Sequence, residues 1–346
     1  MSSEWGPKGG RKAYAVGRWM GLCILMLASC ATPWKRYEYG EFRMGTELRV
    51  IVHAEDRDLA ASAVAAAFER ATQLEAALSD YRPTSELSRL SWSAVGTPRV
   101  VSPDLFAVLE RAEFLRSVSA GAFDVTVGPY VALWRRSVRQ GALPSAERLR
   151  EARARVGDGV FSLDREAHSV TMHVADARLD LGGVAKGYIA DRMLALLVES
   201  GFPRALVDIG GDVAVGEPPP GTMGWRVALA GHDASAAPTE FVELQSCGIA
   251  TSGDQGHSVE IAGLRYSHVI DPRTGLGMTA RRTATAIAPD AATADALASA
   301  ACVLDPAESM AMSTRVDGAS LRVLAVGEAT REEFRSPGFP PLRRHE

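Results

Sequence analysis

Residues 180–191 read DLGGVAKGYIAD, and this stretch joins the end of a predicted strand to a glycine turn and the start of a helix. The helix is expected from about Gly187 to Gly201, and a strand at Ala205–Ile209 follows it. Glycine lets backbone groups approach a ligand closely, and a helix N-terminus attracts anions such as phosphate. The stretch lacks the GxxxxGK[ST] pattern of a P-loop. Taken alone, it fits a phosphate site and a tight structural turn equally well.

The elements expected on both sides of this stretch predict the α+β class. Helices are expected over about 20 residues from Asp58, from Ser102-Pro103 to near Gly121, from about Ala292 to Leu304, and near Glu308–Arg315. A hairpin is expected over Val160–Met172, and short strands at Trp225–Leu229, Phe241–Leu244, Ile249–Thr251, Ser258–Ile261, Thr283–Ala288 and Leu321–Val326. Strands and helices do not alternate strictly, which favours α+β over a doubly wound parallel sheet.

The composition is that of an ordinary globular chain. The 346 residues are 47% hydrophobic and 23% charged, with a formal net charge of −4. These fractions argue against intrinsic disorder and against a multi-span membrane protein. The chain has no basic excess that would indicate nucleic-acid binding. Its length suits one large domain or two small ones.

The first 29 residues have the composition of an export signal. Four basic residues stand against one acidic residue in this segment, and a short apolar run then leads to Leu27-Ala28-Ser29-Cys30. The last four residues resemble a bacterial lipobox, in which Cys30 is lipidated and becomes the mature N-terminus. The alternatives are an ordinary signal peptide or a retained anchor. We therefore expect a lipid-anchored protein of the cell envelope that faces the periplasm, and Ala31 favours the outer membrane over the inner one.

Two cysteines remain after such processing, Cys247 and Cys302. They lack the spacing of a zinc site, and whether they pair is open. Cys302 lies in an apolar run and is expected to be buried.

Other polar clusters carry candidate chemistry. The segment Tyr266–Gly275 places a histidine, an aspartate and an arginine in one turn, so His268 is a candidate base. A histidine that packs or caps the turn is the structural alternative. Asp295 and Ser299 are four residues apart on one face of a predicted helix, and hard oxygen donors at that spacing suit Mg²⁺. For this pair alone, an aspartate that is favourable near a helix N-terminus is the simpler explanation.

Taken together and in order, these segments resemble the ApbE-type FAD:protein FMN transferases. The matching pieces are Met44 to Thr46, Leu78 to Tyr81 with Ser85 to Leu90, Gly121 to Trp134, Asp180 to Asp191, Asp208 to Asp212, Thr251 to Asp254, Ser267 to Gly275, and Ala294 to Ser299. They cover nearly the whole chain after the signal.

The resemblance implies a single α+β domain, related to the T-fold, with mixed, mainly antiparallel sheets and packed helices. The domain is expected over residues 36–330, and residues 331–346 are expected to form a flexible tail. The reaction implied is Mg²⁺-dependent transfer of FMN from FAD to a Thr or Ser hydroxyl of an exported acceptor protein, with release of AMP. The acceptor would be a protein such as a membrane redox-pump subunit, and no nucleic acid is involved.

The resemblance also assigns roles to residues. FAD would be contacted by Met44, Tyr81, Ala122, Phe123, Asp124, Asp180, Lys186 and Ile270. The metal would be held by the Gly183 carbonyl, the Asp295 carboxylate and the Ser299 hydroxyl, and His268 would be the base for the acceptor hydroxyl.

Two positions depart from the family pattern. Residue 299 is serine where threonine is usual, so the hydroxyl is kept but the methyl group that steadies its rotamer is lost. Position 298 is alanine, where some relatives place a second acidic ligand. Two other functions stay open: an FAD pyrophosphatase that releases FMN and AMP, and a flavin-binding lipoprotein without turnover.

Overall fold

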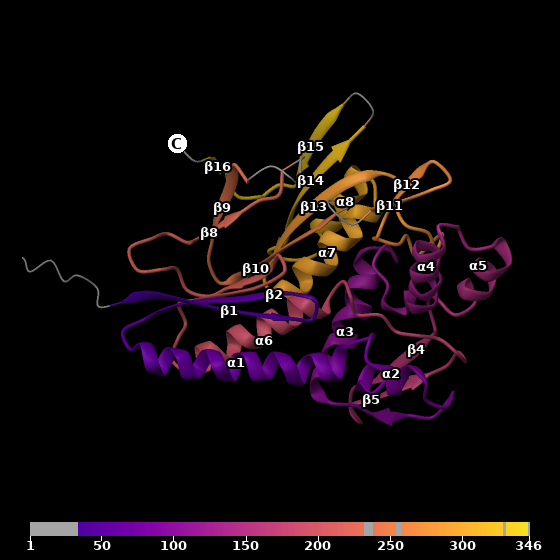
Figure 1. Cartoon of the computed structure of the whole chain (residues 1–346), viewed down its shortest axis with the longest axis horizontal. Coiled ribbons are helices and arrows are strands. Elements are labelled where there is room, and N and C mark those ends of the chain that lie inside the picture. The colour runs from indigo at the N-terminus through magenta and orange to yellow at the C-terminus, as the bar shows by residue number, and fades with distance from the viewer. Residues whose placement is uncertain (1–33, 232–237, 254–257, 328–329, 345–346) are drawn as a thin grey trace, which may run out of the picture. The chain divides into compact units, whose positions relative to one another are not determined.

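A long antiparallel sheet organises the chain (Figure 1). The computed structural model describes residues 34–231, 238–253, 258–327 and 330–344. The sheet has eight strands in the order β1-β2-β6-β7-β10-β13-β14-β15, and each neighbouring pair is antiparallel. Its strands are β1 Lys35–Arg43, β2 Thr46–Ala54, β6 Ala205–Ile209, β7 Asp212–Val215, β10 Cys247–Gly253, β13 Arg281–Ala288, β14 Ser320–Val326 and β15 Arg331–Arg335.

Three smaller antiparallel sheets complete the strand content. They are β3 Arg99–Val100 with β5 Ser169–Met172 and β4 Phe161–Asp164; β11 Ser258–Ile261 with β12 Leu264–Ser267; and β16 Arg343–Arg344 with β9 Glu240–Leu244 and β8 Trp225–Ala228.

Most of the described helices begin at a capping side chain. Asp56 accepts the backbone N–H groups of Asp58 and Leu59, and Ser102 accepts that of Leu105. The helices are α1 Arg57–Leu78, α2 Glu86–Ser91, α3 Pro103–Val118, the 3₁₀ turn η1 Val125–Val127, α4 Gly128–Gln140, α5 Ala146–Arg153, α6 Ala185–Glu199, α7 Ala291–Val303 and α8 Pro306–Ser313. Within the described ranges, α4 and α6 lack a side-chain cap, and none of the helices is both long enough and apolar enough to cross a membrane.

The strands bury both faces of the long sheet by alternation. On β2, Val50 and Val52 belong to the large core shared with α1, α6 and α7, whereas Ile51 between them belongs to a second core. That second core also takes in Trp225 of β8 and Val242 of β9. Helices therefore pack on one face of the sheet, and the small sheet that contains β8 and β9 packs on the other.

The start of α7 is clamped between α6 and β10. A β-carbon on Gly187 of α6 would overlap the carbonyl of Ala291, and one on Gly248 of β10 would overlap the backbone of the same residue. The Asp191 carboxylate of α6 accepts the N–H groups of Ala291 and Ala292 at 2.8 and 2.9 Å. These contacts fix where α7 begins relative to the glycine turn before α6.

The α+β class and the main helices and strands are confirmed. The structure contradicts the prediction of a flexible tail after residue 330. β15 pairs with β14, β16 pairs with β9, and the buried Ser336 bonds to Leu321. Phe339 and Leu342 also pack against the second core. Residues 331–344 are thus part of the fold and not a flexible tail. The predicted export signal and Cys30 lie outside the described residues.

The clamp predicts that a methyl group at Gly248 is costly. Gly248→Ala should lower the free energy of unfolding by about 2–3 kcal/mol because the backbone of α7 must move away. Gly40→Ala is the matched control, since Gly40 also lies in a strand and its β-carbon would meet atoms only at 3.7 Å. Urea unfolding measures both variants. Equal effects of the two substitutions would contradict the clamp.

Candidate functional site

A partly buried ion pair marks the first turn of α6. The Lys186 ammonium donates to the carboxylate of Asp212, which ends the glycine turn between β6 and β7. The Asp212 side chain is 3% exposed and that of Lys186 is 38% exposed. Burial lowers the pKa of Lys186, but the carboxylates of Asp212 and Asp295 outweigh it and hold the pKa above its usual value. Lys186 is therefore a fixed positive charge.

Asp295 lies beside this pair on the first turns of α7. It is 3% exposed, and its carboxylate accepts the backbone N–H of Gly187. Burial, followed by the charge of Asp212, raises the pKa of Asp295 to about 8. Its Oδ2 atom has no hydrogen-bond partner among the described residues. A buried carboxylate oxygen without a partner is costly unless a cation or a donor meets it.

The other two predicted metal ligands meet at the glycine turn. A β-carbon on Gly183 would lie 3.1 Å from the Ser299 hydroxyl and 3.3 Å from the ring of Phe123. The Ser299 hydroxyl lies 3.1 Å from that of Ser252 on β10. This hydrogen bond steadies the serine rotamer, which a threonine methyl group would otherwise do.

These residues fit a small hard cation. The orphaned Asp295 Oδ2, the Ser299 hydroxyl and the Gly183 backbone are all oxygen donors of the kind that Mg²⁺ prefers. No group of three or more His, Cys, Asp or Glu side chains in the described ranges is arranged to hold a metal ion. The set found here has one carboxylate only, so the remaining ligands would come from water or substrate.

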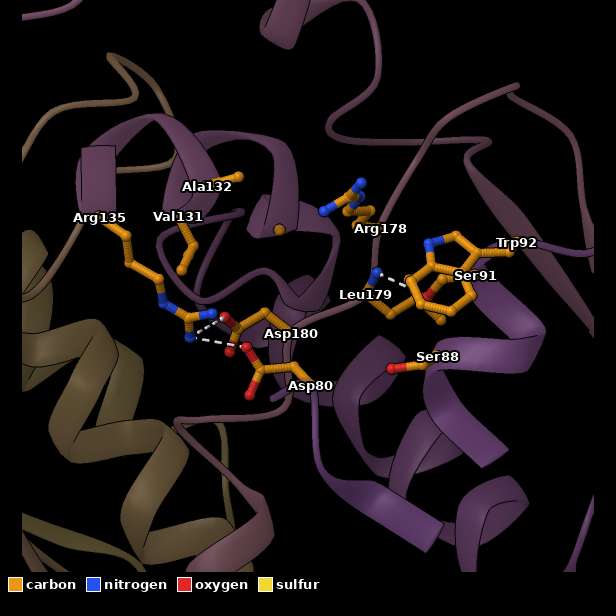
Figure 2. A pocket seen from close by; sticks show the side chains of 11 residues that line it. Asp80, Ser88, Ser91, Trp92, Val131, Ala132, Arg135, Arg178, Leu179 and Asp180 are labelled. Carbon is orange, nitrogen blue, oxygen red and sulfur yellow. Dashed lines mark hydrogen bonds and ion pairs between the residues drawn. The ribbon is translucent and has the colours of Figure 1, made fainter. Parts of the chain in front are cut away.

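A second cluster joins the segment after α1, the middle of α4 and the segment before the glycine turn (Figure 2). The prediction of a strand that ends at Asp180 is wrong, since the described residues between β5 and α6 form no strand. Arg135 donates to Asp80 at 2.6 Å, lies 3.8 Å from Asp180, and stacks over the Tyr81 ring at 4.0 Å. Burial and the nearby Asp80 charge raise the pKa of Asp180 to about 6. A pocket opens here, lined among others by Trp92 of the α2 end and Arg178.

The two clusters adjoin through the segment that holds Phe123. The Asp180 N–H donates to the Val125 carbonyl at 2.7 Å, and the Phe123 ring contacts Gly183. Ala122 and Phe123 are buried. Asp124 is buried as well, and it accepts from Thr126 and from the Arg116 guanidinium, so both of its oxygens have partners. The structure gives Asp124 a capping role, and its FAD contact stays a prediction.

Met44 forms the hairpin turn between β1 and β2 with Gly45. Both residues have left-handed backbones, with φ of 53° and 73°, as a two-residue hairpin requires. Thr46, next in the chain, packs against Gly210, and Gly210 bonds to the Glu47 carbonyl. The predicted FAD contact at Met44 thus lies beside the turn that carries Asp212.

His268 and Ile270 follow β12 on a loop that packs against α4. His268 is exposed. Ile270 packs in a small cluster with Trp134, whose ring lies 5.7 Å from that of Tyr266. Trp134 precedes Arg135, so α4 connects this loop to the second cluster.

Sequence reasoning did not select four residues that the structure brings into these clusters: Asp80, Arg135, Asp212 and Ser252. Asp212 and Ser252 lie inside two of the matched glycine-containing segments, Asp208 to Asp212 and Thr251 to Asp254. Those segments are the sequence signal that could have found the two residues. Asp80 precedes Tyr81, and Arg135 follows a matched segment. No local sequence pattern predicts the contact between Asp80 and Arg135.

Comparisons with known proteins support the family resemblance and the fold. The model of the ApbE family matches residues 44–322. An FAD:protein FMN transferase of Treponema pallidum is 34% identical over 319 residues, which covers 86% of this chain and 87% of that protein. One from Vibrio cholerae is 28% identical and covers 92% and 96%. The solved flavin transferase ApbE from Vibrio cholerae aligns with a TM-score of 0.78 at 26% identity, over 89% of this chain and 99% of that one.

The ion pair at α6 predicts that removing one partner lowers stability more than removing both. Lys186→Met leaves the Asp212 charge buried without its partner, which should lower the free energy of unfolding by about 2–3 kcal/mol; solvent exposure of Lys186 keeps the loss below that of a fully buried pair. The double variant with Asp212→Asn should recover most of the loss in urea unfolding. If it recovers nothing, the pair does not carry the effect.

Asp191 predicts a pH dependence of stability. Burial raises the pKa of Asp191 to about 7, against 3.8 for an ordinary aspartate. A raised folded-state pKa adds stability at low pH that is lost as pH rises through the folded value. The free energy of unfolding of the wild type, relative to Asp191→Asn, should therefore fall as the pH rises from about 4 to about 7. Parallel curves for the two proteins would contradict this titration.

Proposed function

The chain belongs to the ApbE family, and we propose that it transfers FMN from FAD to a Thr or Ser hydroxyl of an acceptor protein and releases AMP. The observation that carries this proposal is the meeting of Gly183, Lys186, Asp295 and Ser299 at the adjoining starts of α6 and α7. Positive charge, oxygen donors and a helix start gather there within a glycine turn. That combination suits a pyrophosphate.

The start of α6 contributes to anion binding in two ways. Its N-cap residue, Val184, provides no side-chain cap. The N–H groups of Ala185 and Gly187 already donate to the Leu181 carbonyl and to Asp295, so the helix offers an anion the positive end of its dipole. Lys186 adds a positive charge on the same turn. A phosphate group of FAD would be attracted to both.

The proposed reaction exchanges the phosphoanhydride bond within FAD for a phosphoester bond to the acceptor. The acceptor oxygen bonds to the FMN phosphorus, the bridging P–O bond of the pyrophosphate breaks, and the bridging oxygen leaves with AMP. His268 takes the proton of the hydroxyl. Lys186 holds the phosphates, while Met44, Tyr81, Ala122, Phe123, Asp124, Asp180 and Ile270 are proposed to contact FAD.

Mg²⁺ is part of the proposal. The Gly183 carbonyl, the Asp295 carboxylate and the Ser299 hydroxyl would hold it. When bound, it would neutralise charge on the pyrophosphate oxygens. The unpartnered Asp295 Oδ2 supports this assignment.

We also propose that the acceptor is an exported protein and that Cys30 anchors the transferase by lipid at the cell envelope. The export signal predicted for residues 1–29 supports both statements. A membrane redox-pump subunit is the kind of acceptor expected.

Intact-mass spectrometry tests the transfer. After incubation with FAD, Mg²⁺ and an exported acceptor domain, the acceptor should gain the mass of FMN, and AMP should appear in equal amount. Steady release of AMP with free FMN, and an acceptor of unchanged mass, would identify an FAD pyrophosphatase instead. Bound FAD without any AMP would identify a binding protein.

Asp295→Asn tests the metal site. Loss of the carboxylate should lower the rate of transfer by about 100-fold or more. The fold should be kept, since the buried carboxyl is replaced by a neutral group of the same shape. Asp317→Asn, an exposed aspartate, is the control. Melting temperature and AMP release measure the two effects, and a variant with parental turnover would remove Asp295 from the site.

His268→Ala tests the base. Transfer should fall by about 100-fold or more near neutral pH, because the acceptor hydroxyl then loses its proton to water. His173→Ala is the matched control, since His173 is an exposed histidine whose ring bonds to Ser162 at 2.8 Å. Transfer at the parental rate across the pH range would show that the base lies elsewhere.

A further inference from the structure

Arg135 lines the pocket of Figure 2 together with Asp80 and Asp180, and it also contacts Tyr81. Asp180 and Tyr81 are proposed to bind FAD. We propose that Arg135 is a positioning residue whose guanidinium holds the Tyr81 ring and the Asp180 carboxyl in place for an aromatic ring of FAD. This inference rests on the proposed function, and it concerns a residue that the sequence did not select.

Tyr81 needs such a support. It lies two residues beyond the C-cap of α1, and 75% of it is exposed. An exposed tyrosine on a loop samples several rotamers, and fixing it costs side-chain entropy. The guanidinium of Arg135 lies over the ring at 4.0 Å to its centroid. One face of the ring is thereby covered, and the high exposure of the residue leaves the other available for stacking.

Arg135 also offsets the negative charges of Asp80 and Asp180. The carboxyl groups of Asp80 and Asp180 interact directly, and Arg135 donates to Asp80 and lies 3.8 Å from Asp180. Figure 2 shows both carboxyl groups turned toward the guanidinium. Two adjacent carboxylates repel each other, and the cation between them relieves the repulsion. Asp180 is then kept as an acceptor for an N–H group of a bound ring.

Arg135 is itself held by a rigid element. The start of α4 approaches the chain closely at Gly128, where a β-carbon would lie 2.7 Å from the β-carbon of Arg178. Trp134, next to Arg135, is 5% exposed and packs with Ile261 and Tyr266. α4 therefore holds Arg135 in place, and the loop that carries Tyr81 is positioned against it.

Substitutions at Arg135 in the full chain test this role. Arg135→Ala should weaken FAD binding, measured without acceptor by quenching of flavin fluorescence, by about tenfold, the sum of a lost ring contact and a lost ion pair. KM for FAD should rise to the same extent, while kcat changes less than about twofold. Arg135→Lys keeps the charge and should recover part of the affinity.

Two controls separate positioning from a general structural effect. Arg136→Ala, on the next residue of α4, removes an exposed arginine that bonds to Gln140 at 3.3 Å, and it should bind FAD as the wild type does. In the Tyr81→Ala background, Arg135→Ala should cost less than about half of its effect in the wild type. Additive effects, or a fall in kcat with unchanged KM, would overturn the inference.

The outcomes also separate this inference from the proposed function. A wild type that binds FAD in an Arg135-dependent way but modifies no acceptor would contradict the transferase and keep the positioning role. A wild type that transfers FMN, with Arg135→Ala binding FAD normally, would contradict the positioning role alone. A wild type that does not bind FAD would overturn both.

Discussion

The close packing of the α7 start against α6 and β10 is the constraint on which the site depends. Glycines at 187 and 248 allow the backbones to approach Ala291, and Asp191 ties the first N–H groups of α7 to α6. Because α7 begins there, Asp295 and Ser299 fall beside the glycine turn that precedes α6. Residues that are more than 100 positions apart in the chain are thus joined by helix starts, which are stiffer than loops.

The same packing explains the distribution of charge around Lys186. Asp295 and Asp212 are both buried near Lys186, and a single lysine does not neutralise two carboxylates. The result is a raised pKa for Asp295 and an unpartnered oxygen, which are unfavourable for stability alone. Such an excess of buried negative charge is expected at a site that binds a cation together with an anionic substrate.

Elements with a strong apolar period could be predicted from the sequence, and others could not. The helices α1 and α3 were expected near their observed bounds, because their apolar residues recur at helical spacing. The helix α7 was also expected near its bounds, although nearly all of its residues are buried. The strand β15, of sequence REEFR, has almost no apolar face and is held by pairing with β14. Edge strands of this kind draw their stability from backbone hydrogen bonds, which leave no hydrophobic signal. The site followed the same rule: the glycine turn carried a local signal, whereas the partnership of Arg135 with Asp80 exists only in the folded chain.

We propose that the adjoining starts of α6 and α7 hold the metal that serves FMN transfer. Anomalous scattering from Mn²⁺ in crystals grown with FAD tests it most directly, since Mn²⁺ accepts the same oxygen donors as Mg²⁺. One peak is expected within bonding distance of Asp295 Oδ2, the Ser299 hydroxyl and the Gly183 carbonyl. FAD bound at the glycine turn with the peak elsewhere, or with no peak, would contradict it.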